Sequence, residues 1–394
     1  MKITDLKTWV VANPPPHFGG RYFLLLKLTT DGGVSGAGEV YAATFSPAVT
    51  AAMIEDVFAR HLLGADPRRI EALWREVYGR GYTMRPDVSL VGVLSGLEMA
   101  CWDILGKEAG KPVHALLGGR VHEKLRSYTY LYPQDGDAAD VYTDPDTAAA
   151  RAAEYAELGF TALKFDPAGA YGVYDGRQPS LDELERAEKI TARVREAVGT
   201  RADLLIGTHG QFTAAGAIRF ARRLEKYQPL WFEEPVPPER PGEMARVARA
   251  TSIPIASGER LTTKYEFARL MERGAAAILQ PALGRVGGIL EAKKIAGMAE
   301  TRYLQIAPHL YCGPVEGAAN IQLAACSPNF LLLEGIQTWG GFHAEILQTP
   351  IRWQDGYVIP PDAPGLGVEI NEAVAEANPY RGSELHLEMH PRPL

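Results

Sequence analysis

Two patterns of hydrophobic and polar positions follow one another along the chain. The first part has extended runs over residues 6–12, 22–29 and 34–40, with a hairpin signal at Asp31-Gly32-Gly33. Apolar residues at helical spacing follow over residues 47–63, 69–78 and 90–110. A meander of strands followed by helices predicts an α+β domain, which we place at residues 1–125. The helix over 90–110 is too apolar for the surface and is expected to lie between two domains.

From residue 126 onward, short apolar strands alternate with helical stretches. The predicted strands are 126–132, 161–165, 204–207, 230–233, 253–257, 277–280, 304–307 and 331–334. Short apolar runs without alternation are typical of parallel strands that are covered on both faces. Eight of them predict an α/β fold, a (β/α)8 TIM-type barrel over residues 126–345, with its active site at the carboxyl ends of the strands. Residues 346–394 lack this pattern and are expected to fold back on the first domain.

Composition narrows the function classes. The chain of 394 residues is 46% hydrophobic and 23% charged, as is ordinary for a globular protein, and its net charge of -7 argues against nucleic-acid or membrane partners. The three cysteines form no CxxC pair, which is typical of a reducing compartment. We recognise neither a signal peptide nor an apolar run long enough to span a membrane, so a cytoplasmic location is expected.

Polar and ionisable residues follow the predicted strands at their carboxyl ends. They are Lys164, Asp166, His209, Glu233, Glu234, Glu259, Gln280, His309 and Glu334. Packing does not explain such a set, because buried charges are costly unless they are paired or bound to metal. Glu233 and Glu259, on neighbouring strands, provide the hard oxygen ligands that suit Mg²⁺.

Several motifs in order resemble the mandelate racemase branch of the enolase superfamily. They are the stretches 92–103 and 106–119, Trp231–Pro235 (WFEEP), Gly258–Arg260 (GER), 287–300 and Ala307–His309 (APH). The resemblance implies a capping domain, a modified (β/α)7β barrel and a Mg²⁺ ion. It also implies abstraction of the proton α to a carboxylate, with the resulting enediolate stabilised by the metal.

The sequence departs from this family's pattern at three places. Gly207 stands where the resemblance implies the first metal-binding aspartate, and Ala282 replaces the aspartate that orients the histidine of strand seven. Asp166 replaces the second lysine of a Lys-x-Lys pair. The expected site is therefore a rebuilt one, or one that has lost its original chemistry.

For the metal, we expect Glu233 and Glu259 as ligands, with Asp166 or His209 as the third. We favour Asp166, since Mg²⁺ prefers oxygen to imidazole. The position of His209 resembles the histidine that, in sugar-acid dehydratases of this branch, protonates the departing 3-hydroxyl.

The general base has two candidates. His309 is favoured because imidazole titrates near physiological pH, and Lys164 is the alternative if its pKa is depressed. By resemblance, Glu334 is the carboxylate that hydrogen-bonds the substrate, a role that requires it to be protonated.

The favoured function is dehydration of an aldonate or aldarate sugar acid to a 2-keto-3-deoxy acid. The alternatives are a racemase, epimerase or cycloisomerase, and a barrel that binds a carboxylate without turnover. Arg21, Tyr130, Arg260 and Tyr311 are expected to bind substrate, and the loop 14–20 is expected to close over it. The resemblance also implies a homo-oligomer, commonly an octamer.

Overall fold

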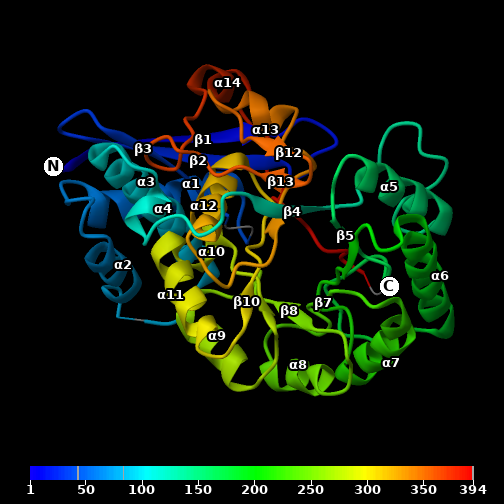
Figure 1. Cartoon of the computed structure of the whole chain (residues 1–394). Coiled ribbons are helices and arrows are strands. Elements are labelled where there is room, and N and C mark those ends of the chain that lie inside the picture. Colours follow the sequence, from blue (N-terminus) through cyan, green and yellow to red (C-terminus); the bar gives the residue numbers. More distant parts are fainter. Residues whose placement is uncertain (42–43, 83, 393–394) are drawn as a thin grey trace.

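The computed structural model describes residues 1–41, 44–82 and 84–392, and its amino-terminal unit is an antiparallel sheet backed by helices (Figure 1). The sheet has the order β1-β2-β3, with strands Ile3–Ala12, Tyr22–Thr30 and Ser35–Glu39. The helices of this unit are α1 (Pro47–Val57), η1 (Phe58–Leu62), α2 (Ile70–Gly79), α3 (Val88–Ala109) and α4 (Val113–Leu116).

Helix α3 lies between the sheet and the second unit, as its apolar sequence predicts. Asp87 caps its first turn by accepting from the amides of Ser89 and Leu90. By length and hydropathy this helix could cross a membrane, which the sequence analysis did not recognise, but 78% of its apolar window is buried inside the molecule. Strand β3 approaches it so closely that a Cβ on Gly38 would lie 1.9 Å from the Gly96 carbonyl oxygen.

The second unit is the predicted parallel barrel. Its strands are β4 (Leu125–Tyr130), β5 (Ala162–Phe165), β6 (Asp203–Ile206), β7 (Trp231–Glu233), β8 (Ile255–Ser257), β9 (Ile278–Leu279), β10 (Gln305–Ile306) and β11 (Leu333–Glu334). Parallel pairing runs from β4 to β10 in chain order, β11 pairs with β4, and the bridge between Ile306 and Phe330 joins the two ends. The α/β barrel with a capping domain is confirmed.

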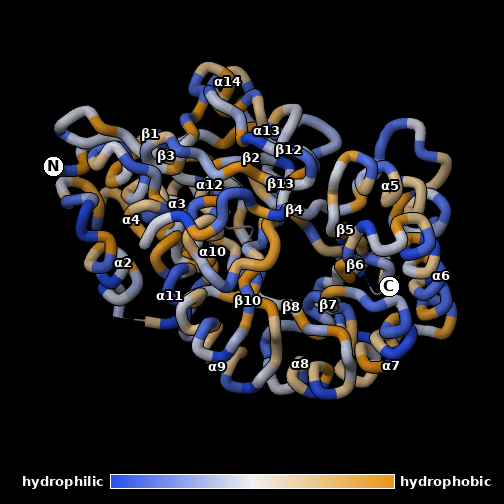
Figure 2. Tube along the Cα trace, in the orientation of Figure 1, coloured by the Kyte–Doolittle hydropathy of each residue, from blue (hydrophilic) through white to orange (hydrophobic). Residues whose placement is uncertain are grey.

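Helices surround the strands on the outside (Figure 1). They are α5 (Pro145–Glu157), α6 (Leu181–Val198), α7 (Ala214–Leu224), η2 (Glu225–Tyr227), α8 (Pro241–Ala248), α9 (Thr263–Glu272), α10 (Leu283–Val286), α11 (Gly288–Glu300) and α12 (Pro314–Ala325). Outer helices such as α6 and α7 carry both hydrophilic and hydrophobic positions (Figure 2), because one face packs on the barrel while the other meets water.

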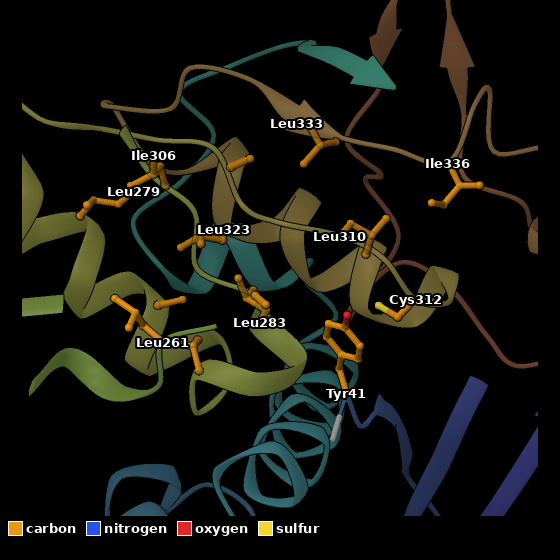
Figure 3. Close-up of a cluster of buried hydrophobic side chains, with 14 of the residues drawn as sticks. Tyr41, Leu261, Leu279, Leu283, Ile306, Leu310, Cys312, Leu323, Leu333 and Ile336 are labelled. Carbon is orange, nitrogen blue, oxygen red and sulfur yellow. The ribbon is translucent and has the colours of Figure 1, made fainter. Parts of the chain in front are cut away.

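The barrel interior contains one residue for each strand. These residues are Tyr128, Ala162, Leu205, Trp231, Ala256, Ile278, Ala307 and Leu332. A second and larger core lies between the strands and the helices, and Figure 3 shows the part in which Leu279, Ile306 and Leu333 approach Leu283 and Leu323. Burying both faces of each strand explains why the strands carry continuous apolar runs.

The chain after β11 returns to the capping domain. It contains α13 (Phe342–Glu345), β12 (Trp353–Gln354), β13 (Tyr357–Val358) and α14 (Glu372–Ala377). Strand β13 pairs antiparallel with β4, and beyond α14 the carbonyl of Asn378 accepts from the amide of Ala12 at 2.8 Å. The domain boundaries at residues 125 and 345 remain predictions.

Residues 385–390 cross from the capping domain to the barrel (Figure 1). The carbonyl of Leu385 accepts from Arg21 at 3.0 Å, and His390 forms a β-bridge with Gly172 of the barrel. We name residues 385–390 the tail segment. It connects both units beside the carboxyl ends of the strands.

Candidate active site

The period of two along each strand places the site above the barrel core. Residues two positions beyond the eight interior residues form the next layer: Tyr130, Lys164, Gly207, Glu233, Gly258, Gln280, His309 and Glu334. Side chains two apart on a strand point the same way, so these residues converge at the carboxyl end of the barrel. This alternation is why the predicted candidates meet although they are far apart in sequence.

A cavity of about 370 Å³ lies at this end of the barrel, a size suited to a small molecule. Lys164, Asp166, His209, Glu259, His309 and Glu334 line it together with Tyr41, Tyr130, Tyr132, Tyr142, Tyr171 and Tyr311. Most of the predicted site residues are therefore brought together around one space.

Lys164 lies at the bottom of this site, almost fully buried. Its ammonium nitrogen is 2.5 Å from Glu233 Oε1 and 3.2 Å from Glu334 Oε1. Burial lowers the pKa of Lys164, but Glu233 and Glu334 raise it more, so that the pKa lies well above its usual value. A protonated lysine has no lone pair, and the structure does not support Lys164 as the general base.

Glu233 has no free oxygen for a metal ion. Lys164 binds its Oε1, while Gln280 Nε2 and Trp231 Nε1 donate to its Oε2 at 2.8 and 3.1 Å. Glu259 is likewise paired with a basic group, since its Oε2 lies 3.3 Å from His309 Nε2.

The predicted metal set of Glu233, Glu259 and Asp166 is not assembled. In the part of the chain that the structure describes, no group of three or more histidine, cysteine, aspartate or glutamate side chains could hold a metal ion. Nitrogen donors occupy the positions beside the carboxylates, so the residues present do not fit Mg²⁺. The trio of metal ligands stays a prediction, because sequence position does not reveal which cation each carboxylate faces.

At Gly207, where the resemblance implies a metal-binding aspartate, there is no room for a side chain. A Cβ added there would lie 2.5 Å from the Tyr130 hydroxyl oxygen and 3.2 Å from Lys164 Cε. Tyr130 therefore fills the space that a side chain at position 207 would need.

Asp166 orients His209 and is not free for a metal. Its Oδ2 lies 3.2 Å from His209 Nδ1, and its Oδ1 accepts from the amide of Ala168 at 3.1 Å. The ring of Tyr171 stacks on His209, with centroids 4.3 Å apart. Burial lowers the pKa of His209, but the bond to Asp166 and the nearby Glu259 raise it more, so the net shift is upward.

His309 has a different environment. Its Nε2 faces Glu259, its Nδ1 has no hydrogen-bond partner among the described residues, and Tyr41 stacks on its ring at 6.0 Å. Burial lowers the pKa of His309 and outweighs the opposing effect of Glu259. A neutral imidazole carries one lone pair, on either Nδ1 or Nε2. Glu259 thus takes up the ring contact that Ala282 cannot make.

Glu334 faces two donors. Lys164 binds its Oε1, and its Oε2 accepts from the amide of Leu310 at 2.8 Å. This arrangement suits a carboxylate acceptor and does not support the predicted role as a protonated hydrogen-bond donor to substrate.

The four predicted substrate-binding residues divide into two pairs. Tyr130 and Tyr311 line the cavity, and the buried Tyr130 hydroxyl has no partner among the described residues. Arg21 instead binds the tail segment through Leu385 and Glu388.

Arg260 also lies outside the cavity lining. It pairs with the buried Glu234 at 2.5 Å. Ion pairs within the protein already bind both arginine side chains, so their contact with substrate stays a prediction.

The sequence analysis missed the cavity residues that come from loops and from the tail segment. These are Tyr41, Tyr132, Asp140, Tyr142, Thr143, Gly169, Ala170, Tyr171 and Leu387. Only Tyr132 has a signal in the sequence, because it follows Tyr130 by two positions. Its ring stacks on Phe18 of the capping-domain loop at 4.2 Å, so this loop does reach the barrel mouth.

Comparison with known proteins identifies the family. Residues 18–118 match the mandelate racemase / muconate lactonizing enzyme N-terminal domain, and residues 147–374 match the family described as enolase C-terminal domain-like. The chain belongs to the mandelate racemase/muconate lactonizing enzyme family. The predicted membership of this branch of the enolase superfamily is confirmed.

Individual relatives of this family cover almost the whole chain. A D-galactonate dehydratase of Ralstonia nicotianae is 38% identical over 95% of this chain and 93% of its own length. A D-galactonate dehydratase of Pectobacterium atrosepticum is 35% identical over 94% and 93%. A crystal structure of a mandelate racemase/muconate lactonizing enzyme from Labrenzia alexandrii is 64% identical, with a TM-score of 0.98 over 100% of this chain and 99% of its own.

Proposed function

We propose that this protein is a hydro-lyase that dehydrates a sugar acid, an aldonate or an aldarate. The observation that carries the proposal is the pair of histidines on one cavity, His209 beside Asp166 and His309 beside Glu259. Their pKa values shift in opposite directions, as a general acid and a general base require. The relatives named D-galactonate dehydratase support the same reaction class.

His309 acts as the general base in this proposal. His309 lines the cavity, and in this proposal its lone pair removes the proton from C2 of the substrate, next to the carboxylate. The lowered pKa keeps the ring neutral near physiological pH, so the lone pair is available.

His209 acts as the general acid. Its Nδ1–H is held by Asp166, which leaves Nε2–H to protonate the hydroxyl that departs from C3. The upward pKa shift favours the protonated form of this ring before the transfer.

The atoms balance without an oxidant or reductant. The C2–H bond breaks, its electron pair forms the C2–C3 double bond, and the C3–O bond breaks with release of water. The enol product then tautomerises to a 2-keto-3-deoxy acid. No step is assigned to Mg²⁺, because the side chains that were expected to bind it are already paired.

The substrate, the cellular location and the oligomeric state of the protein remain predictions. The family supports a small-molecule carboxylate as substrate, while the cytoplasmic location and the octameric homo-oligomer rest on the sequence alone. The tyrosine hydroxyls around the cavity are suitable partners for the hydroxyl groups of a sugar acid.

The test is a screen of the purified protein against a panel of aldonic and aldaric acids with detection of the ketone. We expect one stereochemical set to give a 2-keto-3-deoxy acid. Exchange of the C2 proton without any ketone would favour a racemase or an epimerase, and the absence of both reactions would contradict an enzymatic role on these acids.

A further inference from the structure

The side chain of Lys164 lies where the resemblance implies a metal ion. Lys164 is nearly fully buried, at 1% exposure, and its ammonium lies between Glu233 and Glu334 on two other strands. A cation thus occupies the place beside Glu233 where the resemblance implies a metal ion. Its ring neighbour is Tyr130, whose centroid is 4.8 Å from the ammonium nitrogen.

The Lys164 ammonium has one hydrogen-bond donor that the two glutamates do not use. A lysine ammonium carries three N–H donors, and the two glutamates accept from two of them. Lys164 also lines the cavity, so its third donor is available to a bound carboxylate.

Tyr130 provides a second donor at the same place. Its hydroxyl is buried and has no partner among the described residues, although buried polar groups are nearly always hydrogen-bonded. The absence of a side chain on Gly207 gives this hydroxyl its room. A ligand oxygen near Lys164 would complete its hydrogen bonding.

We propose that Lys164, assisted by Tyr130, takes the place of the metal ion in this enzyme. On the proposed dehydratase function, the ammonium binds the substrate carboxylate and stabilises the negative charge that develops when the C2 proton leaves. The reaction then needs no divalent cation. Lys164 is a catalytic residue in this account, as an electrophile and not as a base.

The first test measures metal binding by the wild-type protein itself. Mn²⁺ is titrated into the protein, with and without tartronate as a small diacid that resembles the enediolate, and free Mn²⁺ is followed by electron paramagnetic resonance. We expect no specific uptake in either case. Binding of one Mn²⁺ per chain in either case would overturn the proposal, and no variant has to fold for this test.

The second test measures tartronate binding by calorimetry in the presence of EDTA. We expect the wild type to bind, Lys164→Met to lose about 100-fold in affinity, and Tyr130→Phe to lose roughly tenfold. Lys264→Met is the matched control, since it removes a lysine beside the buried Glu291 at 3.0 Å but away from the cavity.

Three results of the second test would overturn the proposal. The first is tartronate binding that requires added Mg²⁺. The second is equal tartronate binding by the wild type and by a folded Lys164→Met variant. The third is the absence of tartronate binding under every condition. Dehydration that stops in EDTA and returns with Mg²⁺ would also refute it while leaving the proposed function intact. Tartronate could bind without metal and depend on Lys164 while no sugar acid is turned over. That result would support the role of Lys164 and contradict the proposed function.

Discussion

At the scale of single residues, the account depends on two histidines that differ in what surrounds them. His209 is held by an aspartate and shifts upward in pKa, whereas His309 is dominated by burial and shifts downward. Their roles should therefore be separable by substitution and by pH.

Replacing His309 and replacing His209 should have different effects on C2 proton exchange and on loss of the 3-hydroxyl. His309→Asn should lose both C2 proton exchange and dehydration, by roughly 10²–10⁴-fold, because the base is needed first. His209→Asn should keep exchange in deuterium oxide while it loses dehydration to a similar degree. Nuclear magnetic resonance of the substrate measures both rates, with His61→Asn, outside the cavity lining, as the control. Retained exchange in His309→Asn would assign the base elsewhere.

The pH dependence of kcat/KM should be bell-shaped. Activity should rise as His309 loses its proton, at a pKa below its ordinary value, and fall as His209 loses its proton, at a pKa above it. Asp166→Asn should move the alkaline limb to lower pH, because the bond that raises the His209 pKa is lost. Asp146→Asn, on an exposed ion pair with Arg193, is the control. An unmoved alkaline limb would show that His209 is not the titrating acid.

At the scale of elements, the short strands were the easiest part to predict. Most are rich in apolar residues, since one face meets the barrel interior and the other meets the helices. The same strands carry the site layer, because Lys164 and Glu233 each follow an interior residue by two positions. The candidate residues could therefore be located from the sequence.

Their partners could not be predicted in the same way. The ion pair of Lys164 with Glu233 depends on side-chain directions across two strands that β6 separates. The missing Cβ of Gly207 indicates a lost ligand in the sequence, but only the structure places Tyr130 in that space. The Tyr130 hydroxyl occupies the space beside Gly207 where the resemblance implies a metal ligand.

The contact between β3 and α3 offers a test of the packing. In Gly38→Ala the new methyl group would meet the backbone carbonyl of Gly96 at 1.9 Å, which no rotamer can relieve. We expect the free energy of unfolding to fall by about 1–3 kcal/mol in urea titrations. Gly32→Ala, where nothing lies within 4 Å, should change it by less than about 0.5 kcal/mol. Equal stability of both variants would mean that the two elements are not in close contact.

At the scale of the whole molecule, the cavity is completed by segments that are distant in sequence. Tyr41 comes from the capping domain, Tyr142 from a barrel loop and Leu387 from the tail segment. No periodicity connects these positions, so sequence patterns alone could not assign them to the site. These residues line one cavity because of the way the capping domain and the barrel pack together.

The tail segment should affect substrate binding more than chemistry. Leu387→Ala removes apolar surface from the cavity wall and should raise KM by up to about tenfold, with a smaller change in kcat. Leu158→Ala, at a similarly exposed position outside the cavity lining, should leave both constants unchanged in steady-state assays. An unchanged KM in Leu387→Ala would show that the tail does not contact substrate.

The central claim is that this family member dehydrates a sugar acid with two histidines and a lysine. The most direct measurement follows the wild-type protein with the panel of sugar acids by nuclear magnetic resonance, in deuterium oxide that contains EDTA. The account predicts that one acid loses its C2 proton signal while a 3-deoxy product carrying deuterium at C3 appears. If every acid keeps its C2 proton and no ketone forms, with or without added Mg²⁺, the account is contradicted.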